Sequence, residues 1–153
     1  MPAQDHSGGS VWTSAALLLG RLLLALIFVH EGFVLLGGSR AAVAYMERFG
    51  VPGMLLPAVI LLELGGGILI AVGALTRVAA LAFSIFCVLT ALLFHTDFAD
   101  QNQLLHFQKD LGLAGGFLVL TVCGSGAWSV DRLRSRYATR TSAREGNAAR
   151  ESG

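Results

Sequence analysis

Residues Leu55–Val72 read LLPAVILLELGGGILIAV and contain a single ionisable side chain, that of Glu63. A helix of about 20 residues is long enough to cross the hydrocarbon core of a bilayer, and this stretch is close to that length. A charged side chain at the centre of a bilayer costs roughly 2.5 kcal/mol or more. The sequence therefore predicts a membrane-spanning helix in which Glu63 has either a partner or a function.

The composition of the whole chain agrees with a membrane protein. Of its 153 residues, 54% are hydrophobic and 14% are charged, and the mean hydropathy is +0.67. Soluble domains carry about 25% charged residues. The arginines near the C-terminus are not interleaved with aromatic residues, so the sequence does not indicate nucleic-acid binding. The composition excludes a soluble enzyme and predicts a lipid bilayer as the surroundings of one small domain.

Apolar runs along the chain set the expected fold. Because backbone groups in lipid must form hydrogen bonds within the protein, such runs are expected to be helices. We predict an all-α, four-transmembrane-helix bundle over residues 13–130, with helices at about 13–36, 55–75, 78–95 and 110–127. The flanking segments, 1–12 and the basic segment 131–153, are predicted to be disordered, since both are polar.

The connections differ in character. Residues Ala41–Phe49 are predicted to form a short helix at the membrane surface, with Tyr45 and Phe49 at headgroup level. The tight Thr76–Arg77 connection predicts an antiparallel hairpin of the second and third spans. The segment His95–Lys109 is expected to be a solvated loop, which includes Asp97, Asp100 and His106. Small residues are expected to let helices approach closely; they are Gly65, Gly66, Gly67, Gly112 and Gly116.

The distribution of Lys and Arg predicts the orientation. With four spans both termini lie on one side, and eight of the 11 basic residues fall on that side, including Arg21 and Arg77. The other three are Arg40, Arg48 and Lys109. Because cytoplasmic flanks are enriched in Lys and Arg, we expect both termini to be cytoplasmic. Arg21 and Arg77 are interpreted as topology anchors, and Arg21 is expected to extend to the nearer interface.

Threading the four helices in this orientation brings polar groups together at the outer, non-cytoplasmic side. Glu63 lies about eight residues, or roughly 12 Å, from the outer end of its helix. Adjacent residues point about 100° apart on a helix, so we expect Glu31 to face inward and His30 to face a neighbouring helix. The cytoplasmic half is expected to be apolar. The candidate ligand-binding residues in the outer pocket are Glu63, Glu31, His30, His95 and Lys109.

Each candidate also has a purely structural interpretation. Glu63 could simply pair with a neighbouring donor, and Lys109 and Asp110 could only flank the fourth helix. No HxxxH or ExxH pattern indicates a metal site. Cys87 and Cys123 are interpreted as small buried apolar residues, and a redox pair requires that two helices bring them together. No residue is assigned a catalytic role, and whether the protein is an enzyme is left open.

Several segments of this chain resemble the DoxX family of small bacterial inner-membrane proteins. The segments are FVHEG (28–32), YMERFGVPG (45–53), LLELGGGILIAVGALTR (61–77), ALLFH (91–95) and WSVDRL (128–133). The resemblance implies that Arg21, Glu63, Arg77 and His95 occupy recurring polar positions. This chain lacks the Lys that members of the family often carry shortly after the glycine corresponding to Gly32. His30, His95 or Lys109 could take its place beside Glu63.

The resemblance also implies a link to redox or oxidative-stress systems of the bacterial inner membrane. Our first hypothesis is a multi-pass membrane subunit whose outer pocket binds a small molecule, with a quinone as the candidate ligand and a membrane or periplasmic redox protein as the partner. The alternative is a non-catalytic assembly or scaffold protein. A proton-coupled carrier is a third hypothesis, although the sequence has no inverted repeat. The chain is also a candidate for homo-oligomer formation.

Overall fold

The computed structural model describes residues 11–151, with only the backbone described for residue 140 and residues 142–151. Residues 1–10, which belong to the segment predicted to be disordered, lie outside the described residues. The ordered elements are α1 (Val11–Gly37), α2 (Ser39–Arg48), η1 (Gly53–Leu55), α3 (Leu56–Ile60), η2 (Leu61–Gly66), α4 (Gly67–Val72), α5 (Thr76–Phe94), α6 (Gln101–Cys123) and α7 (Val130–Glu151). No strand occurs among residues 11–151.

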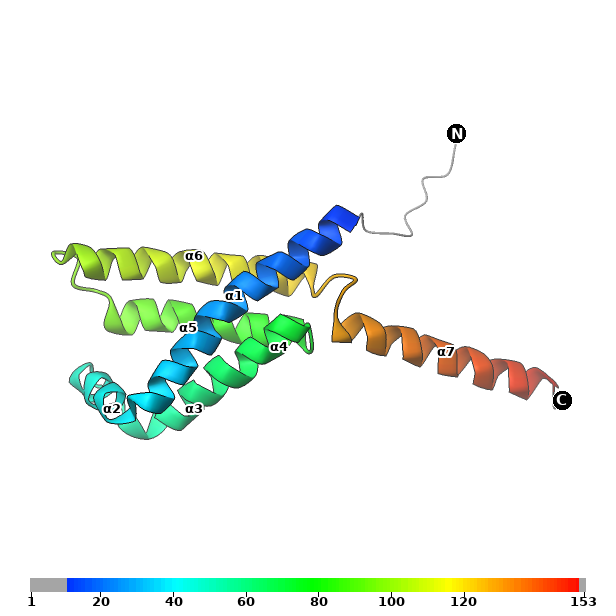
Figure 1. Ribbon diagram of the computed structural model, residues 1–153, viewed down its shortest axis with the longest axis horizontal. Helices are drawn as coiled ribbons and strands as arrows, with labels where there is room; N and C mark the ends of the chain where they lie inside the picture. The colour runs from blue at the N-terminus through cyan, green and yellow to red at the C-terminus, as the bar shows by residue number, and fades with distance from the viewer. Residues whose placement is uncertain (1–10, 152–153) are drawn as a thin grey trace.

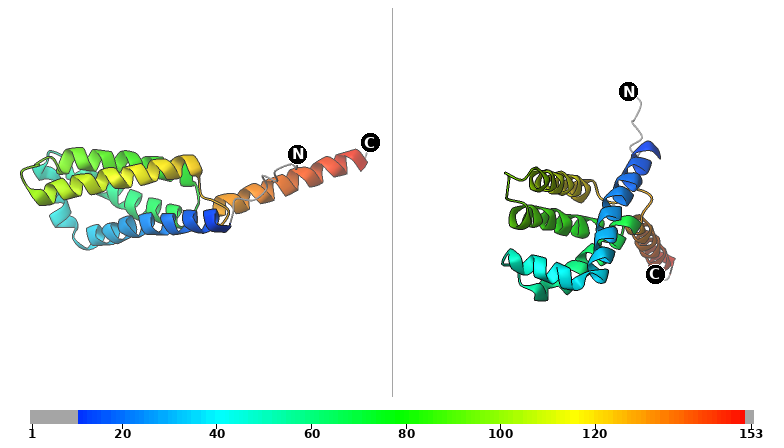
Figure 2. Two further views of the ribbon diagram at one scale, coloured as in Figure 1. Left: turned by 90° about the horizontal axis from the view of Figure 1, so that it is seen from above. Right: turned by 60° about the vertical axis from the view of Figure 1, so that its left-hand side comes forward.

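Four helical columns form the bundle (Figure 1). They are α1, the continuous column from η1 to α4, α5 and α6. The first three, Val11–Gly37, Gly53–Val72 and Thr76–Phe94, are long and apolar enough to cross a membrane. The fourth, α6, runs antiparallel beside α5 (Figures 1 and 2) but carries polar residues in its first half, which lower its hydropathy. The prediction of an all-α membrane bundle is confirmed.

The second column is not a regular α-helix. Residues Leu61–Gly66 form a π-helical segment, η2, between the α-helical segments α3 and α4. Segments of this kind are rare and are found frequently at functional sites. The column ends at Gly73, whose φ of 71° is left-handed, and Ala74 N–H donates to the carbonyl of Leu69 over 2.9 Å. Glu63 therefore sits in the irregular part of an otherwise apolar helix.

An aromatic cluster fills the middle of the bundle. The Phe28, Phe83 and Phe117 rings come from α1, α5 and α6, with centroids 4.4 to 5.5 Å apart. Glycines of the second column pack against this core as predicted, because a Cβ on Gly66 would lie 2.9 Å from the Phe83 ring. Gly112 does not fit that prediction, since nothing lies within 4 Å of its Cβ position. The closest helix contacts are therefore made at Gly66 and its neighbours, while in α6 the Cβ position of Gly116 lies 3.5 Å from Leu24 of α1.

Helix α6 begins earlier than predicted, at Gln101 rather than near residue 110. The Asp100 side chain accepts a hydrogen bond from the backbone N–H of Asn102 over 2.9 Å, which caps the N-terminus of the helix. His106 is therefore helical, and only Asp97 and Asp100 of the predicted loop residues lie in a true loop, 95–100. Helix α6 also ends earlier than predicted, at Cys123, because Gly124 adopts a φ of 74°.

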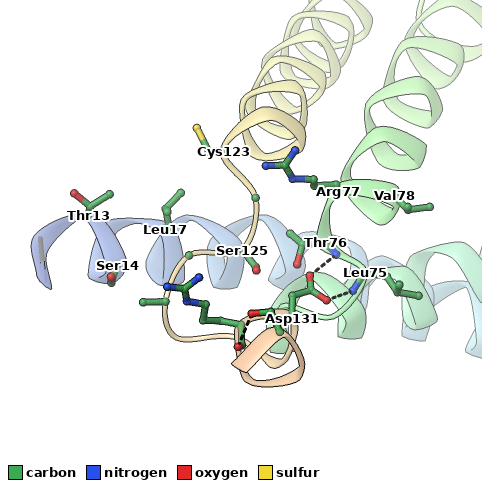
Figure 3. Close-up of a pocket in the computed structure, with 15 residues that line it drawn as sticks. Thr13, Ser14, Leu17, Leu75, Thr76, Arg77, Val78, Cys123, Ser125 and Asp131 are labelled. Atoms are coloured by element: carbon green, nitrogen blue, oxygen red, sulfur yellow. Dashed lines mark hydrogen bonds between the residues drawn. The ribbon is translucent and has the colours of Figure 1, made fainter. Parts of the chain in front are cut away.

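The end of the bundle where α7 begins, which we call the terminal end, is closed by hydrogen bonds. The Asp131 carboxylate accepts from the backbone N–H of Leu75 and of Thr76 over 2.9 and 3.0 Å (Figure 3). The Arg21 guanidinium donates from Nη2 to the carbonyl of Trp128 over 2.7 Å. Only 1% of Arg21 is exposed, so the prediction that it extends to the interface is wrong. The terminal half of the bundle is consequently not purely apolar.

The basic segment 131–153 was predicted to be disordered, but α7 is helical over Val130–Glu151 and projects from the bundle (Figure 2). Ser129 Oγ accepts from the N–H of Arg132 over 3.2 Å at its N-terminus. Asp131 lies in the first turn, where an acid is favourable. The Ala and Arg residues of the segment have high helix propensity, which a judgement based on polarity alone neglected.

Helix α2 lies at the opposite end of the bundle, which we call the loop end. Its Tyr45 ring stacks on Phe94 with a centroid distance of 5.5 Å, and the Phe49 ring contacts Phe94 edge-on at 5.4 Å. This aromatic contact ties the short helix to the end of α5. The helix predicted over 41–49 is thus present, and its packing encloses the space next to Glu63.

Candidate functional site

Glu63 points into the interior of the bundle. Only 7% of the residue is exposed, and its Oε2 atom is buried without a hydrogen-bond partner. An unpartnered buried polar atom costs about 1–3 kcal/mol and more when it is charged. The π-helical segment places this side chain where α1, α5 and α6 converge.

A cavity of about 360 Å³ surrounds the Glu63 carboxyl group, and we call it the polar cavity. Three carboxyl groups and three basic groups line it, together with apolar and hydroxyl side chains. The acids are Glu31, Glu63 and Asp110, and the bases are His95, His106 and Lys109. These six residues come from four different elements, α1, η2, α6 and the end of α5. Acidic and basic side chains are thus equal in number around the cavity.

The His95 imidazole is the centre of a hydrogen-bonded group in this cavity. Its Nδ1 lies 2.8 Å from Gln103 Oε1, which assigns the Nδ1 proton to His95. Its Nε2 faces Asp110 Oδ2 at 3.8 Å, close enough for an ion pair but too far for a hydrogen bond. Asp110 Oδ2 is buried without any hydrogen bond. His95 and Asp110 are therefore not hydrogen-bonded to each other. Asp110 Oδ2, like Glu63 Oε2, remains able to accept a hydrogen bond.

His106 extends the same group toward the surface. Its ring stacks on His95 with centroids 5.0 Å apart, and Lys109 Nζ lies 3.3 Å from its Nδ1. The lysine can only donate, so Nδ1 of His106 accepts and its proton sits on Nε2. A chain of basic groups thus leads from exposed Lys109 to His95 beside the buried acids.

A second, more apolar cavity of about 680 Å³ adjoins the polar cavity, and we call it the apolar chamber. It lies between α1, α2, α3 and α5 and is lined mainly by aliphatic and aromatic side chains. The two cavities share six lining residues: Glu31, Tyr45, Glu63, Phe86, Thr90 and His95. Both volumes lie within the range of about 300–1,000 Å³ that is usual for small-molecule sites.

The structure brings together four of the five predicted site residues. Glu63, Glu31, His95 and Lys109 line the polar cavity, whereas His30 lines neither cavity. The His30 side chain is 70% exposed and lies 3.8 Å from Glu31, whose side chain is 55% exposed. Glu31 thus lies at the rim of the cavity, and His30 lies outside it on the surface of α1.

Sequence reasoning missed two members of this group, His106 and Asp110. The sequence predicts a loop position for His106, and Asp110 has the interpretation of a residue that only flanks the fourth helix. They are four residues apart, and Gln103 precedes His106 by three, so all three share one helix face. That periodicity would have found them had Asp100 been recognised as the helix cap.

Metal and thiol chemistry receive no support from the arrangement. Within residues 11–151, no three His, Cys, Asp or Glu side chains are placed to hold a metal ion. The two cysteines are free, Cys87 buried in α5 and Cys123 exposed at the end of α6. Cys87 lines the polar cavity, and Cys123 lies at the terminal end instead.

Comparison with known proteins places this fold in a family. The DoxX family model matches residues 16–96. Inner membrane protein YqjF of Escherichia coli (strain K12) is 46% identical over 119 residues, which cover 78% of this chain and 92% of that protein. Inner membrane protein YphA of the same organism is 36% identical over 123 residues, 76% of this chain and 88% of that protein. No solved structure matches.

These matches confirm the resemblance seen in the sequence. The family model covers the first three columns, including Glu63 and His95, and the similarity to the two relatives extends over more than three quarters of the chain. The chain is a member of the DoxX family of integral membrane proteins.

Proposed function

We propose that this protein binds a neutral, lipid-soluble molecule of the quinone class across the polar cavity and the apolar chamber. The observation that carries the proposal is the shared wall of the two cavities, where Glu63 and His95 face polar space on one side and apolar space on the other. A quinone has the same division, with a polar ring and a hydrocarbon tail. Its ring would lie beside Glu63 and its tail in the apolar chamber.

The mixture of acids and bases in the polar cavity supports a neutral ligand. An anion would lie against the three carboxyl groups and a cation against the Lys109 ammonium, so neither finds surroundings of the opposite sign alone. Quinone carbonyl oxygens accept hydrogen bonds, which the imidazole N–H groups and the Lys109 ammonium can donate. The hydroxyl group of the reduced form can donate to Glu63 Oε2, the buried atom that has no partner. Both redox forms of the headgroup thus find complementary groups here.

The proposed location in the cell rests on the names of the two relatives and on the distribution of Lys and Arg along the chain. Both relatives are named as inner membrane proteins. Lys and Arg are more numerous at the terminal end, so we propose cytoplasmic termini and a site in the periplasmic half. The resemblance to DoxX supports a place in a redox or oxidative-stress system, with this protein as a ligand-binding subunit beside a membrane or periplasmic redox partner.

The test is the retention of quinone by the full-length protein. The chain is extracted from cells in polymer discs that keep native lipid, and the molecules bound are identified by mass spectrometry. We expect quinone and its reduced form together in excess over their share of the surrounding lipid. Glu63→Gln should lose the reduced form about tenfold or more, because a buried hydrogen bond to a charged group contributes roughly 1.5–3 kcal/mol. Glu47→Gln, the same change at an exposed glutamate on α2, is the matched control and should retain quinone.

A scaffold function without a ligand gives the opposite result. In that case wild-type protein holds no quinone above the lipid background, and Glu63→Gln changes only the stability of the bundle or the recovery of partner proteins. Equal retention by wild type and Glu63→Gln would also overturn the proposed binding site.

A further inference from the structure

We propose that the terminal end carries a second site, which binds the phosphate of an anionic phospholipid. A cavity of about 730 Å³ opens there between the first turns of α1, the start of α5, the end of α6 and the start of α7, and we call it the terminal cavity (Figure 3). It is separate from the site beside Glu63, with which it shares no lining residue. The proposal goes beyond quinone binding and does not depend on it.

Two arginines give the terminal cavity its charge. Arg77 on α5 and Arg132 on α7 both line it, and neither guanidinium forms a hydrogen bond or ion pair within the described part of the chain. Figure 3 shows the Arg77 side chain reaching from α5 toward the end of α6. Hydroxyl groups of Thr13, Ser14, Ser125 and Ser135 line the same space. Guanidinium groups form strong, charge-assisted hydrogen bonds to phosphate oxygens, and the hydroxyl groups of Thr13, Ser14 and Ser125 are further donors in the same space.

The one acid in the cavity balances at most one of the two positive charges. Asp131 is occupied by the backbone N–H groups of Leu75 and Thr76, which stabilise its negative charge (Figure 3). The basic surface also continues along α7, where Arg132, Ser135, Arg136 and Thr139 line an adjoining groove. Two arginines without partners therefore remain available to an anion from outside the chain.

The position of the cavity favours a lipid as the source of the phosphate. It lies where the apolar helix α5 begins and α6 ends, which is the level of lipid headgroups. Leu17, Leu75 and Val78 form its apolar wall, and Leu75 and Val78 are 55% and 70% exposed. Such a wall suits the start of an acyl chain, whereas a water-soluble phosphate would gain nothing from it. Basic groups beside a membrane helix are typical of anionic headgroup sites.

The experiment compares lipids that differ only in headgroup charge. The full chain is placed in nanodiscs of equal parts phosphatidylglycerol and phosphatidylcholine, released, and examined by native mass spectrometry for bound lipid. We expect an excess of phosphatidylglycerol, reduced about fivefold by either Arg77→Gln or Arg132→Gln and further by both together. Arg77→Lys, which keeps the charge, should retain most of the excess, and Arg40→Gln, an arginine at the loop end, should be unaffected.

Three outcomes would overturn the proposal. The first is equal recovery of the two lipids by wild-type protein. The second is an excess that survives the double variant, which would place the anion elsewhere. The third is thermal stabilisation by inorganic phosphate alone, in detergent without lipid, that equals the effect of phosphatidylglycerol. Arg77→Gln protein that loses stability without any change in the ratio of the two lipids counts with the second outcome, because Arg77 would then only stabilise the C-terminus of α6.

Discussion

The partly or fully buried acids at the two ends of the bundle are bonded in opposite ways. At the terminal end, Arg21 and Asp131 bond to backbone atoms over 2.7 to 3.0 Å. At the loop end, His95 and Asp110 stand 3.8 Å apart, and oxygens of Glu63 and Asp110 have no partner. Arg21 Nε, Arg21 Nη1 and Thr76 Oγ1 at the terminal end are also buried without partners. The Asp131 carboxylate, however, is bonded by the chain itself and holds the start of α7 against the turn between α4 and α5. The acids of the loop end retain unused acceptor capacity and face a cavity, which is what a ligand site requires.

The difference follows from the local backbone. Asp131 N–H donates to the Gly73 carbonyl over 2.9 Å, and its carboxylate bonds Leu75, whose φ of 48° is left-handed. A left-handed conformation costs a residue with a side chain roughly 1–2 kcal/mol. Asp131 offsets that cost with two hydrogen bonds to the first N–H groups of α5. No pair of backbone hydrogen bonds like that at Asp131 holds the Glu63 carboxyl group, which lies in a π-helical segment and faces a cavity.

The largest effect on stability is expected at Gly73. A Cβ there would lie 2.6 Å from Ser129 Cβ and would clash with the Arg21 guanidinium, in addition to the left-handed φ of 71°. Gly73→Ala should lower the free energy of unfolding by about 3 kcal/mol, measured by thermal unfolding in detergent. Gly112→Ala is the control, because its Cβ would occupy open space. Equal stability of the two variants would mean that Gly73 is not packed against Arg21 and Ser129 as described.

The acid-to-amide change should have opposite effects at the two ends. Asp131→Asn removes a charged helix cap, so we expect a loss of about 1 kcal/mol in unfolding free energy, again by thermal unfolding. A variant as stable as wild type would show that the two hydrogen bonds to α5 contribute little.

The companion change is Glu63→Gln in protein stripped of bound lipid-soluble molecules. It replaces a buried acid that has an unpartnered oxygen with a neutral group of the same shape, so we expect unchanged stability or a gain of up to about 1 kcal/mol. The same thermal assay measures it. A marked loss would indicate that Glu63 has a structural partner in the folded protein, and would favour the scaffold function.

The smallest effect concerns pH at the terminal end. Burial raises the pKa of the Asp131 carboxyl group, but the hydrogen bonds from Thr76 and Leu75 and the nearby Arg134 outweigh it and hold the pKa below its usual 3.8. A depressed pKa in the folded state means that the contribution is complete above the unfolded value and is lost as the pH falls through the folded one. Wild-type protein should therefore lose more stability than Asp131→Asn when the pH falls below about 4. Parallel pH profiles would contradict this.

Much of the fold was accessible from sequence because hydrophobic runs in a membrane protein have few alternative structures. The runs around Glu63 and before Phe94 gave spans within a few residues of those observed. Helix lengths and directions alone also predicted which polar side chains converge: Glu63, Glu31, His95 and Lys109. The predicted helix boundaries were wrong where a hydrogen bond between residues close in sequence sets the end of a helix. The Asp100 cap extends α6, and the Ser129 and Asp131 contacts start α7.

Other features required the tertiary structure. A π-helical segment at 61–66 leaves no clear mark in a run of leucines and glycines. The burial of Arg21 depends on Trp128, which is 107 residues away in sequence, so local reasoning placed this arginine at the interface instead. Whether His30 is exposed depends on how α1 is rotated about its own axis, and a rotation equal to one residue is enough to change it.

The most direct test of the site beside Glu63 is protection of ligand-stripped protein against heat by the reduced form of a short-chain quinone, measured in oxygen-free detergent solution over a series of concentrations. Wild-type protein and the exposed-site control Glu47→Gln should show a midpoint that rises with concentration, with stabilisation reaching about 2.7 kcal/mol at one hundred times the dissociation constant. Glu63→Gln should lose most of this shift. An unchanged midpoint for wild-type protein, or an equal shift in Glu63→Gln, would contradict a quinone site at the loop end.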